Sequence, residues 1–509
     1  MRATVVSAIF LLLVAGEGSH VAGMGAQAKA PNRRPGEAGK QLQVDPGVEA
    51  LILDAQSAPA EFAADLLIRI AESGRVADPT YKRRLLEDAF RRAADAQRPV
   101  QRRYIGGEVD TPPGYLAYAF DLKLDALSLR CKAVKAMLSV DKRRARELFA
   151  EIPNLNLRPL GCDDALVYDV TSFYDTLAQV TTTAFTPVER SQGEHIRFAA
   201  PYLESMSSSA QVGPAAKTIL ALVPAPAQLE ILVHSFSKAL GQIPGDDRSF
   251  TYSVTRDSSF GRSLRELVET CNRQNVSSRE LLSEIRSYMV RSLGDSRCSD
   301  NVPQTSPHAE FSYVNDINKA LNFDPPISGD ETEPAEVKTA AKPASYWRTP
   351  ETRDLLLKVR KLRFGSSATP LTAVERQTQD WELALKEFMI SLGAWGGNHE
   401  KSELDYFHQK SVLYRVLLEL VPEGSSRDEI IREYAGFLRD SYSAVDSRIE
   451  WLYHAKFLIG QVRAERGTEY AKAMEMLHSF SDRNLWLYAR AEVVLSIPPK
   501  PSLSQQKPG

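Results

Sequence analysis

Residues 114–152, GYLAYAFDLKLDALSLRCKAVKAMLSVDKRRARELFAEI, predict two antiparallel helices. Apolar residues recur at steps of three or four over residues 116–138, which places them on one face of a helix turning every 3.6 residues. A second apolar row runs beside the first, so this helix needs more than one neighbour to cover it. Asp141 can cap the second helix, and Pro153 follows its end. The two rows are Leu116, Phe120, Leu124, Leu127, Cys131, Val134 and Leu138, and Leu122, Ala126, Leu129, Ala133 and Ala136.

The second helix contains Ala145-x-x-x-Phe149 and is followed by Pro153, a pattern that resembles the end of a tetratricopeptide unit. The resemblance covers this one hairpin and implies its architecture, without assigning any binding residue. The W-x-x-L-G-x-x-Y half of the unit and a fixed period of about 34 residues are missing from the sequence. We therefore predict an all-α fold, an irregular α-solenoid or α-α superhelix of helical hairpins.

Further patterns extend the helical prediction along the chain. Asp78 before Pro79 predicts a helix start, and the three-four spacing over residues 166–180 predicts another helix. Ser277-x-x-Glu280 is a capping box ahead of an apolar row. The one weak strand pattern is Phe250–Val254.

The chain of 509 residues is longer than the roughly 250–300 at which a single core stops growing. Residues 324–346 are Pro-rich and acidic and lack apolar periodicity, so they predict a linker. The linker would separate a helical-repeat domain (46–323) from a second all-α domain (347–497). We expect a disordered lead at 29–45 and a disordered tail at 498–509. All five tryptophans follow the predicted linker: Trp347, Trp381, Trp395, Trp451 and Trp486.

The first 28 residues predict a signal peptide. Arg2 precedes the apolar run Val5–Ala15, which is too short to span a membrane. Ala26-Gln27-Ala28 is an A-x-A cleavage site, and Val14-Ala15-Gly16 is an alternative. The competing interpretation is an uncleaved anchor. We expect a secreted or periplasmic protein without an integral membrane segment after signal removal.

Four cysteines in an exported chain suggest disulfides. The loop after Pro153 can return Cys162 to Cys131, whereas a helix separates Cys271 from Cys298. This geometry mildly favours Cys131–Cys162 over Cys271–Cys298, because bridged Cα atoms lie within about 7 Å. The alternative for Cys131 is a buried, inert thiol on the apolar face.

Ser235-Phe-Ser-Lys238 and Ser299-Asp300-Asn301 match two elements of the serine penicillin-recognising enzymes. The resemblance implies Ser235 as the nucleophile and Lys238 as its activating group. The third element, K-T-G, occurs only as Lys338-Thr339-Ala340, and a second S-x-x-K lies at Ser139–Lys142. Solvent-facing Ser and Lys side chains on a helix are therefore the favoured interpretation.

His399, Glu403 and His408 are the nearest approach to a metal motif. The step of nine residues between the histidines does not place them on one helical face. His408 lies on an apolar face, where a hydrogen-bonded core histidine is favoured over a ligand. We assign no catalytic, cofactor-binding or metal-binding residue from the sequence and expect no cofactor.

The formal net charge is −2, so no global field attracts nucleic acid. The favoured interpretation is a non-catalytic exported scaffold that binds a protein or a cell-envelope polymer. The alternative is a secreted hydrolase for cell-wall or polysaccharide substrates, with an acid pair in an aromatic-lined cleft. Local basic runs have interleaved acids, which favours solvated helix faces with ion pairs over docking to an anionic partner. These runs are Lys82-Arg83-Arg84, Arg91-Arg92, Arg102-Arg103 and Lys142-Arg143-Arg144-Ala-Arg146.

Overall fold

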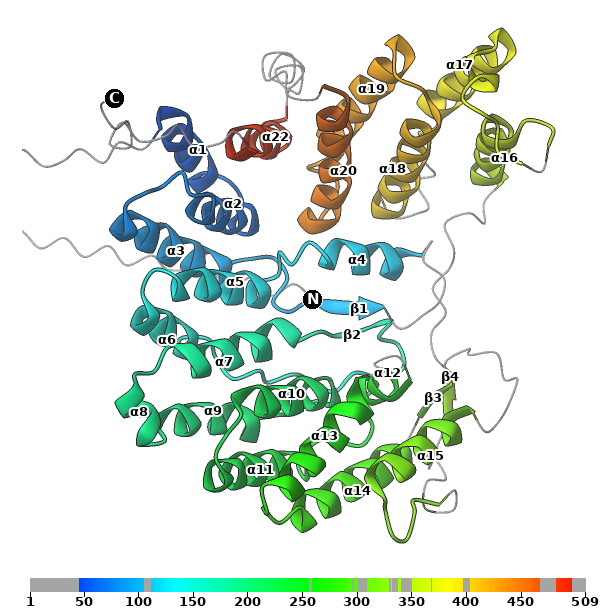
Figure 1. Ribbon diagram of the computed structural model, residues 1–509. Helices are drawn as coiled ribbons and strands as arrows, with labels where there is room; N and C mark the ends of the chain where they lie inside the picture. The colour runs from blue at the N-terminus through cyan, green and yellow to red at the C-terminus, as the bar shows by residue number, and fades with distance from the viewer. Residues whose placement is uncertain are drawn as a thin grey trace, which may run out of the picture. The chain divides into compact units, whose positions relative to one another are not determined.

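The computed structural model describes residues 45–104, 111–255, 259–294, 297–299, 309–328, 331, 337–339, 350–367, 369–396, 403–466 and 482–496. Within these residues it forms 21 α-helices and four short strands, so the predicted all-α fold is confirmed (Figure 1). The predicted signal peptide and tail lie outside the described residues, as does most of the predicted linker. The predicted domain boundary therefore stays a prediction.

The first fifteen helices and the strands β1, β2 and β3 precede the predicted linker, and β4 lies within it. The helices are α1 (Pro46–Gln56), α2 (Ala60–Glu72), α3 (Pro79–Ala93), α4 (Pro112–Phe120), α5 (Ala126–Leu138), α6 (Lys142–Ala150), α7 (Thr171–Thr183), α8 (Pro187–Ser191), α9 (Glu194–Glu204), α10 (Val212–Leu222), α11 (Pro226–Leu240), α12 (Ser249–Thr255), α13 (Phe260–Arg273), α14 (Arg279–Gly294) and α15 (Ala309–Leu321). The strands are β1 (Arg102–Tyr104), β2 (Leu166–Tyr168), β3 (Arg297–Ser299) and β4 (Val337–Thr339).

Six further α-helices follow in the described residues after the linker. They are α16 (Pro350–Phe364), α17 (Gln379–Ala394), α18 (Glu403–Leu420), α19 (Ser425–Ser441), α20 (Arg448–Arg466) and α22 (Arg483–Ser496).

Aspartate caps begin several helices at the residues that the sequence indicates. The Asp78 carboxylate accepts a hydrogen bond from Tyr81 N at 2.7 Å, and Pro79 occupies the first turn of α3. The Asp141 carboxylate likewise accepts from Arg144 N at 3.0 Å at the start of α6. Each cap satisfies a backbone N–H that has no partner within its helix.

The single helix predicted over residues 116–138 is wrong in one respect, because the chain breaks it into α4 and α5. Lys123 has a φ of 55°, a left-handed conformation that ends the first helix. Asp125 then starts the second helix by accepting from Ser128 N at 2.9 Å. The apolar side chains Phe120 and Leu124 are buried on both sides of the turn, so the periodic row continues across the break.

Two other local predictions are wrong. Residues 166–168, expected at the start of a helix, form strand β2, which pairs antiparallel with β1, and α7 begins only at Thr171. Residues 250–254, the weak strand candidate, lie inside helix α12. Apolar spacing continues from β2 into α7 at the first site, and at the second site the alternating pattern covers only five residues, so neither pattern separates a strand from a helix.

Successive helices pack on one another through the first part of the chain (Figure 1). Helix α2 packs on α3 and α5, α5 packs on α7, α7 packs on α10, and α10 packs on α13. In the last part, α18 packs on α19, α19 on α20, and α20 on α22. Contacts also join the two ends of the described chain, because α22 packs on α1 and α20 packs on α4.

No helix among the described residues combines the length and the apolar character that a transmembrane crossing requires.

Candidate anion-binding pocket

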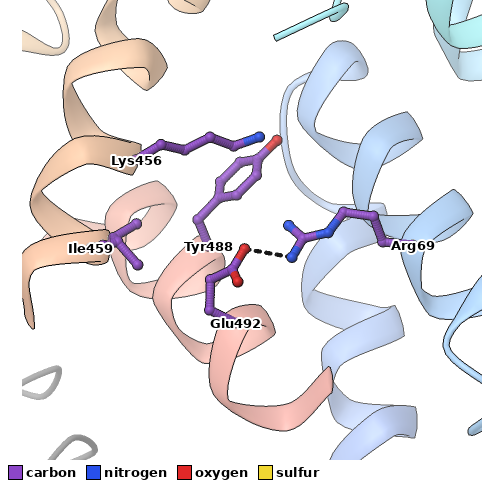
Figure 2. Close-up of a pocket in the computed structure, with 6 residues that line it drawn as sticks. Arg69, Lys456, Ile459, Tyr488 and Glu492 are labelled. Carbon is purple, nitrogen blue, oxygen red and sulfur yellow. Dashed lines mark hydrogen bonds and ion pairs between the residues drawn. The ribbon is translucent and has the colours of Figure 1, made fainter. Parts of the chain in front are cut away.

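Three helices that are distant in the sequence enclose a cavity of about 250 Å³ (Figure 2). Residues three or four positions apart on α20 and on α22 line it together, because that spacing places them on one helical face. The lining residues are Arg69 from α2, Lys456, Ile459 and Gly460 from α20, and Tyr488 and Glu492 from α22.

Aromatic packing holds the wall between α2 and α22. The buried Phe62 ring meets the Tyr488 ring edge to face, with centroids 5.4 Å apart, and lies 6.4 Å from the Trp451 ring. Such ring pairs add to the free energy gained from burial alone. The Tyr488 phenol is thereby fixed at the back of the pocket.

Asp65 lies buried behind the pocket and links α2 to three other helices, α5, α20 and α22. Its carboxylate lies 2.9 Å from Lys132 Nζ, 3.4 Å from the Tyr488 hydroxyl and 3.9 Å from Lys456 Nζ. Burial alone would raise the Asp65 pKa, but the charges of Lys456, Lys132 and Arg69 lower it below its ordinary value. Asp65 is therefore an ionised partner for cations and not a proton donor at neutral pH.

Arg69 and Glu492 form the second ion pair of the pocket. Arg69 Nη2 donates to Glu492 Oε1 at 2.5 Å, as the dashed line in Figure 2 marks. Burial alone would lower the Arg69 pKa, but Asp65 and Glu492 raise it above its ordinary value. The other terminal nitrogen of Arg69 is buried and forms no hydrogen bond within the described part of the chain.

Lys456 is the remaining cation of the pocket. Its ammonium lies beyond hydrogen-bond distance of Asp65 and 5.3 Å from the centre of the Tyr488 ring. Burial, followed by repulsion from Arg69 and Lys132, lowers the Lys456 pKa even though Asp65 opposes this effect. An anionic ligand would relieve the cost of holding this cation out of water.

Tyr488 contributes a neutral phenol. Its burial and the Asp65 charge raise its pKa well above the ordinary value. The pocket thus combines cations, a neutral hydroxyl and paired acids, a set suited to binding an anion. General acid catalysis would instead require a carboxyl group with a raised pKa.

A second polar cluster is fully buried between α18 and α20. His408 Nε2 lies 2.7 Å from Glu450 Oε1, and His408 Nδ1 lies 3.0 Å from His454 Nε2. The Tyr115 ring of α4 stacks on the His408 ring with centroids 5.1 Å apart. This cluster opens onto neither of the two best-formed pockets in the described residues.

The candidate metal motif is not assembled. His399 lies outside the described residues, and Glu403 is exposed at the start of α18. His408 is a hydrogen-bonded core histidine, which was the favoured interpretation. In the part of the chain that the structure describes, no three His, Cys, Asp or Glu side chains are grouped to hold a metal ion.

The elements that resemble penicillin-recognising enzymes are only partly brought together. Residues Ser299 and Thr339 are paired in the parallel ladder of β3 and β4, whereas Asp300, Asn301 and Ala340 lie outside the described residues. Lys238 is exposed on α11 and pairs with Glu204 of α9. Ser235 is buried in α11, so its predicted solvent-facing position is wrong.

Neither expected disulfide pairing is formed, because Cys131 and Cys271 are free, buried thiols. Cys162 is disulfide-bonded, and the side chain of Cys298 lies outside the described residues. The loop that carries Cys162 does not return to α5. Instead it runs to residues 247–248, where Leu160 N donates to Asp247 at 3.3 Å and Arg248 donates to the Cys162 carbonyl.

Burial raises the pKa of the Cys131 thiol to about 12, which matches the alternative of an inert thiol. Burial likewise raises the pKa of the Cys271 thiol to about 11. Neither group is a nucleophile at neutral pH.

Many arginines of the basic runs form ion pairs on helix surfaces. Arg144 contacts Glu87 at 2.8 Å and Glu147 at 3.2 Å, and Arg92 contacts Asp88 at 3.0 Å. The favoured interpretation of a solvated face with local ion pairs is confirmed at these positions.

Two of the tryptophans serve the core. The Trp381 indole donates to the Leu362 carbonyl at 2.9 Å, and the Trp451 indole donates to the Leu438 carbonyl at 2.7 Å. Both side chains are buried, and neither lines the anion pocket.

Sequence reasoning missed the pocket entirely. One local signal exists, since Asp65 and Arg69 stand four residues apart within the apolar helix AEFAADLLIRIAE. Two charged residues in such an apolar helix predict partners elsewhere in the fold, because charges are rarely buried unpaired. Nothing in the spacing identifies Lys456 and Glu492 as partners, because Arg69 and Glu492 are 423 residues apart.

Comparisons of this chain with models of protein families, with curated proteins and with solved structures give no match. The structure defines an all-α protein with a polar pocket, lined by two cations and one acid, between helices α2, α20 and α22.

Proposed function

We propose that the chain is an exported, non-catalytic helical scaffold that binds an acidic cell-envelope polymer or protein. One observation supports this most directly: the two acids at the pocket, Asp65 and Glu492, are held in ion pairs, and Asp65 is shared by two cations, Lys132 and Lys456. Export rests on the predicted signal peptide, and N-terminal sequencing of the protein recovered from outside the cytoplasm tests it.

The alternative, a secreted hydrolase, would need two carboxyl groups about 5–10 Å apart and one raised pKa between them. The pocket places Asp65 and Glu492 beside cations, and the Asp65 pKa is lowered. Asp125 is a buried acid whose pKa burial raises to about 6, but its carboxylate caps α5 and does not line the pocket. No observation in the described residues favours hydrolysis.

The test is binding of the full chain to polygalacturonate, poly-L-glutamate and neutral dextran, measured by isothermal titration at two salt concentrations. We expect an acidic polymer to bind, dextran not to bind, and affinity to fall as salt increases. Lys456→Met should weaken binding at least about tenfold, because it removes the cation whose acidic partner, Asp65 at 3.9 Å, is held more closely by Lys132.

Lys238→Met is the matched control, because Lys238 is an exposed lysine on α11 whose partner is Glu204. It should leave binding unchanged. Equal binding of all three polymers, or equal loss in both lysine variants, would contradict the proposal. Release of reducing sugars from polygalacturonate would instead support the hydrolase.

A further inference from the structure

Helix α17 carries apolar side chains on two opposite faces. Its inner face is buried against α16, where the Trp381 indole donates to the Leu362 carbonyl at 2.9 Å. Leu383 is two residues from the buried Leu385, and Ile390 is two residues from the buried Phe388. Two steps of about 100° turn a side chain to roughly the opposite side of a helix. Leu383 and Ile390 therefore lie on the outer face, where they are 58% and 73% exposed.

Leu383 and Ile390 form one row along this outer face. They are seven residues apart, so they lie about 10 Å apart along the helix axis and only about 20° apart around it. Ala394, which is also exposed, continues the row by one further turn. An apolar row with this spacing is typical of a helix that packs on a second helix. Because α17 packs on α16 through its inner face, the exposed row is accessible to another molecule.

Two opposite charges lie beside this row. Lys386 and Glu387 stand between Leu383 and Ile390 in the sequence, and the turn of about 100° per residue places them on opposite sides of the row. Both are exposed, and neither forms an ion pair within the described part of the chain. We call these five residues the outer α17 face: Leu383, Ile390 and Ala394, with Lys386 on one side and Glu387 on the other.

We propose that the outer α17 face binds the same face of a second copy of this chain, with the two α17 helices parallel. A two-fold axis along such a pair packs the two apolar rows together and places Lys386 of each copy opposite the partner's Glu387. In an antiparallel pair, Lys386 would instead face Lys386, and Glu387 would face Glu387. The face thus supplies both halves of its own charge pattern, and a second copy in the parallel orientation completes it.

The contact is small, which sets the strength expected of it. Helix α17 has 16 residues and is therefore about 24 Å long. One helix pair of this length covers less surface than the about 1,200 Å² of a stable interface, so the dimer should be weak and should dissociate on dilution. This inference does not rest on the proposed function, because association of the chain is measured without any polymer.

The first experiment is sedimentation velocity of the full chain between about 1 µM and about 100 µM, where we expect a shift from monomer to dimer. Ile390→Glu places a charge within the apolar row and should weaken the dimer at least about tenfold. Ile231→Glu is the matched control, because Ile231 is an isoleucine on α11 that is 47% exposed. It should leave association unchanged, and circular dichroism confirms that each variant is folded.

The second experiment exchanges the two charges. Lys386→Glu alone places two acids opposite each other, and Glu387→Lys alone does the same with two lysines, so each variant should dimerise at least about threefold more weakly. Mixed in equal amounts, the two variants form pairs in which every contact is again between opposite charges. The mixture, and the double variant Lys386→Glu/Glu387→Lys, should therefore associate like the unaltered chain.

Three results would overturn the proposal. A chain that remains monomeric at about 100 µM does not form this contact. A dimer that Ile390→Glu leaves intact is held by another surface. Single charge variants that associate as well as the unaltered chain exclude the parallel orientation, because an antiparallel pair has the same number of like-charge contacts before and after each change.

Discussion

His454 is a buried histidine whose environment opposes protonation. Burial, and next the neighbouring charges of His408 and Arg415, lower its pKa well below 6.5. Its Nε2 shares a hydrogen bond with His408, while its Nδ1 forms none within the described part of the chain. Adding a proton would therefore place an uncompensated charge in the core between α18 and α20.

This position should make stability pH-dependent. The unfolded chain takes up a proton at His454 near the ordinary pKa, whereas the folded chain does so only at lower pH, so stability falls as pH decreases through about 6.5. Between about pH 7.5 and about pH 5.5 we expect a loss of about 1 kcal/mol from this group. Urea unfolding at the two pH values measures it.

The variant His454→Gln should lose less stability than the unaltered chain over the same pH interval. His234→Gln serves as control, because His234 is exposed and paired with Glu280 at 3.0 Å. A pH dependence that is the same in His454→Gln as in the unaltered chain would show that His454 is not the responsible group.

Asp65 contrasts with His454, because the folded chain is stabilised by the charged form of its side chain. Its lowered pKa means that its ion pairs stabilise the fold above the ordinary pKa of 3.8 and are lost as pH falls through the lower, folded value. At neutral pH, Asp65→Asn leaves Lys132 and the partly buried Lys456 without an acid. We expect a loss of about 3–5 kcal/mol in the free energy of unfolding.

Urea unfolding at about pH 7.5, where the Asp65 carboxyl of the unaltered chain is ionised, is the measurement for Asp65→Asn. The comparison is Glu492→Gln, which removes an acid whose side chain is 26% exposed and should cost about 1 kcal/mol or less. Equal losses in the two variants would mean that burial does not set the contribution of Asp65.

At the scale of elements, the sequence predicts helix caps but not every helix end. The caps at Asp78 and Asp141 could be predicted, because an aspartate before a periodic apolar row has a definite backbone partner. The break at Lys123 could not, since apolar spacing continues through it. What stabilises that break is distant: Ala126 N donates to the Arg98 carbonyl at 2.8 Å.

The strands and the pocket show the same limit. Residues 166–168 form β2 because residues 102–104 lie beside them, a pairing that no local pattern encodes. Helix α2 has two charged residues, Asp65 and Arg69, in a largely apolar sequence, but the residues that meet them at the pocket lie on α20 and α22. Local rules therefore predicted the kind of fold, whereas the candidate site depends on contacts between distant segments.

At the scale of the whole molecule, the described chain begins and ends in one interface. Helix α22 packs on α1, and the ion pairs of α22 with α1 and α2 are Arg490–Asp54 and Arg69–Glu492. The Tyr488 ring also covers Phe62 at the centre of the contact. Residues more than 400 positions apart therefore stabilise each other, and the pocket exists only while they are together.

A stop codon at residue 483 removes α22 and tests this coupling, and a stop codon at residue 497 retains it as the matched control. Loss of α22 exposes Phe62 and removes one acid and one phenol from the Asp65 cluster, so α1 and α2 should exchange amide hydrogens faster. Helices α13 and α14, which pack on α10 and α11, should keep their protection. Hydrogen exchange with mass spectrometry measures both regions in one experiment. Unchanged exchange in α1 and α2 would show that the first helices are stable without the last, and uniform acceleration would show that the whole described chain unfolds as one unit.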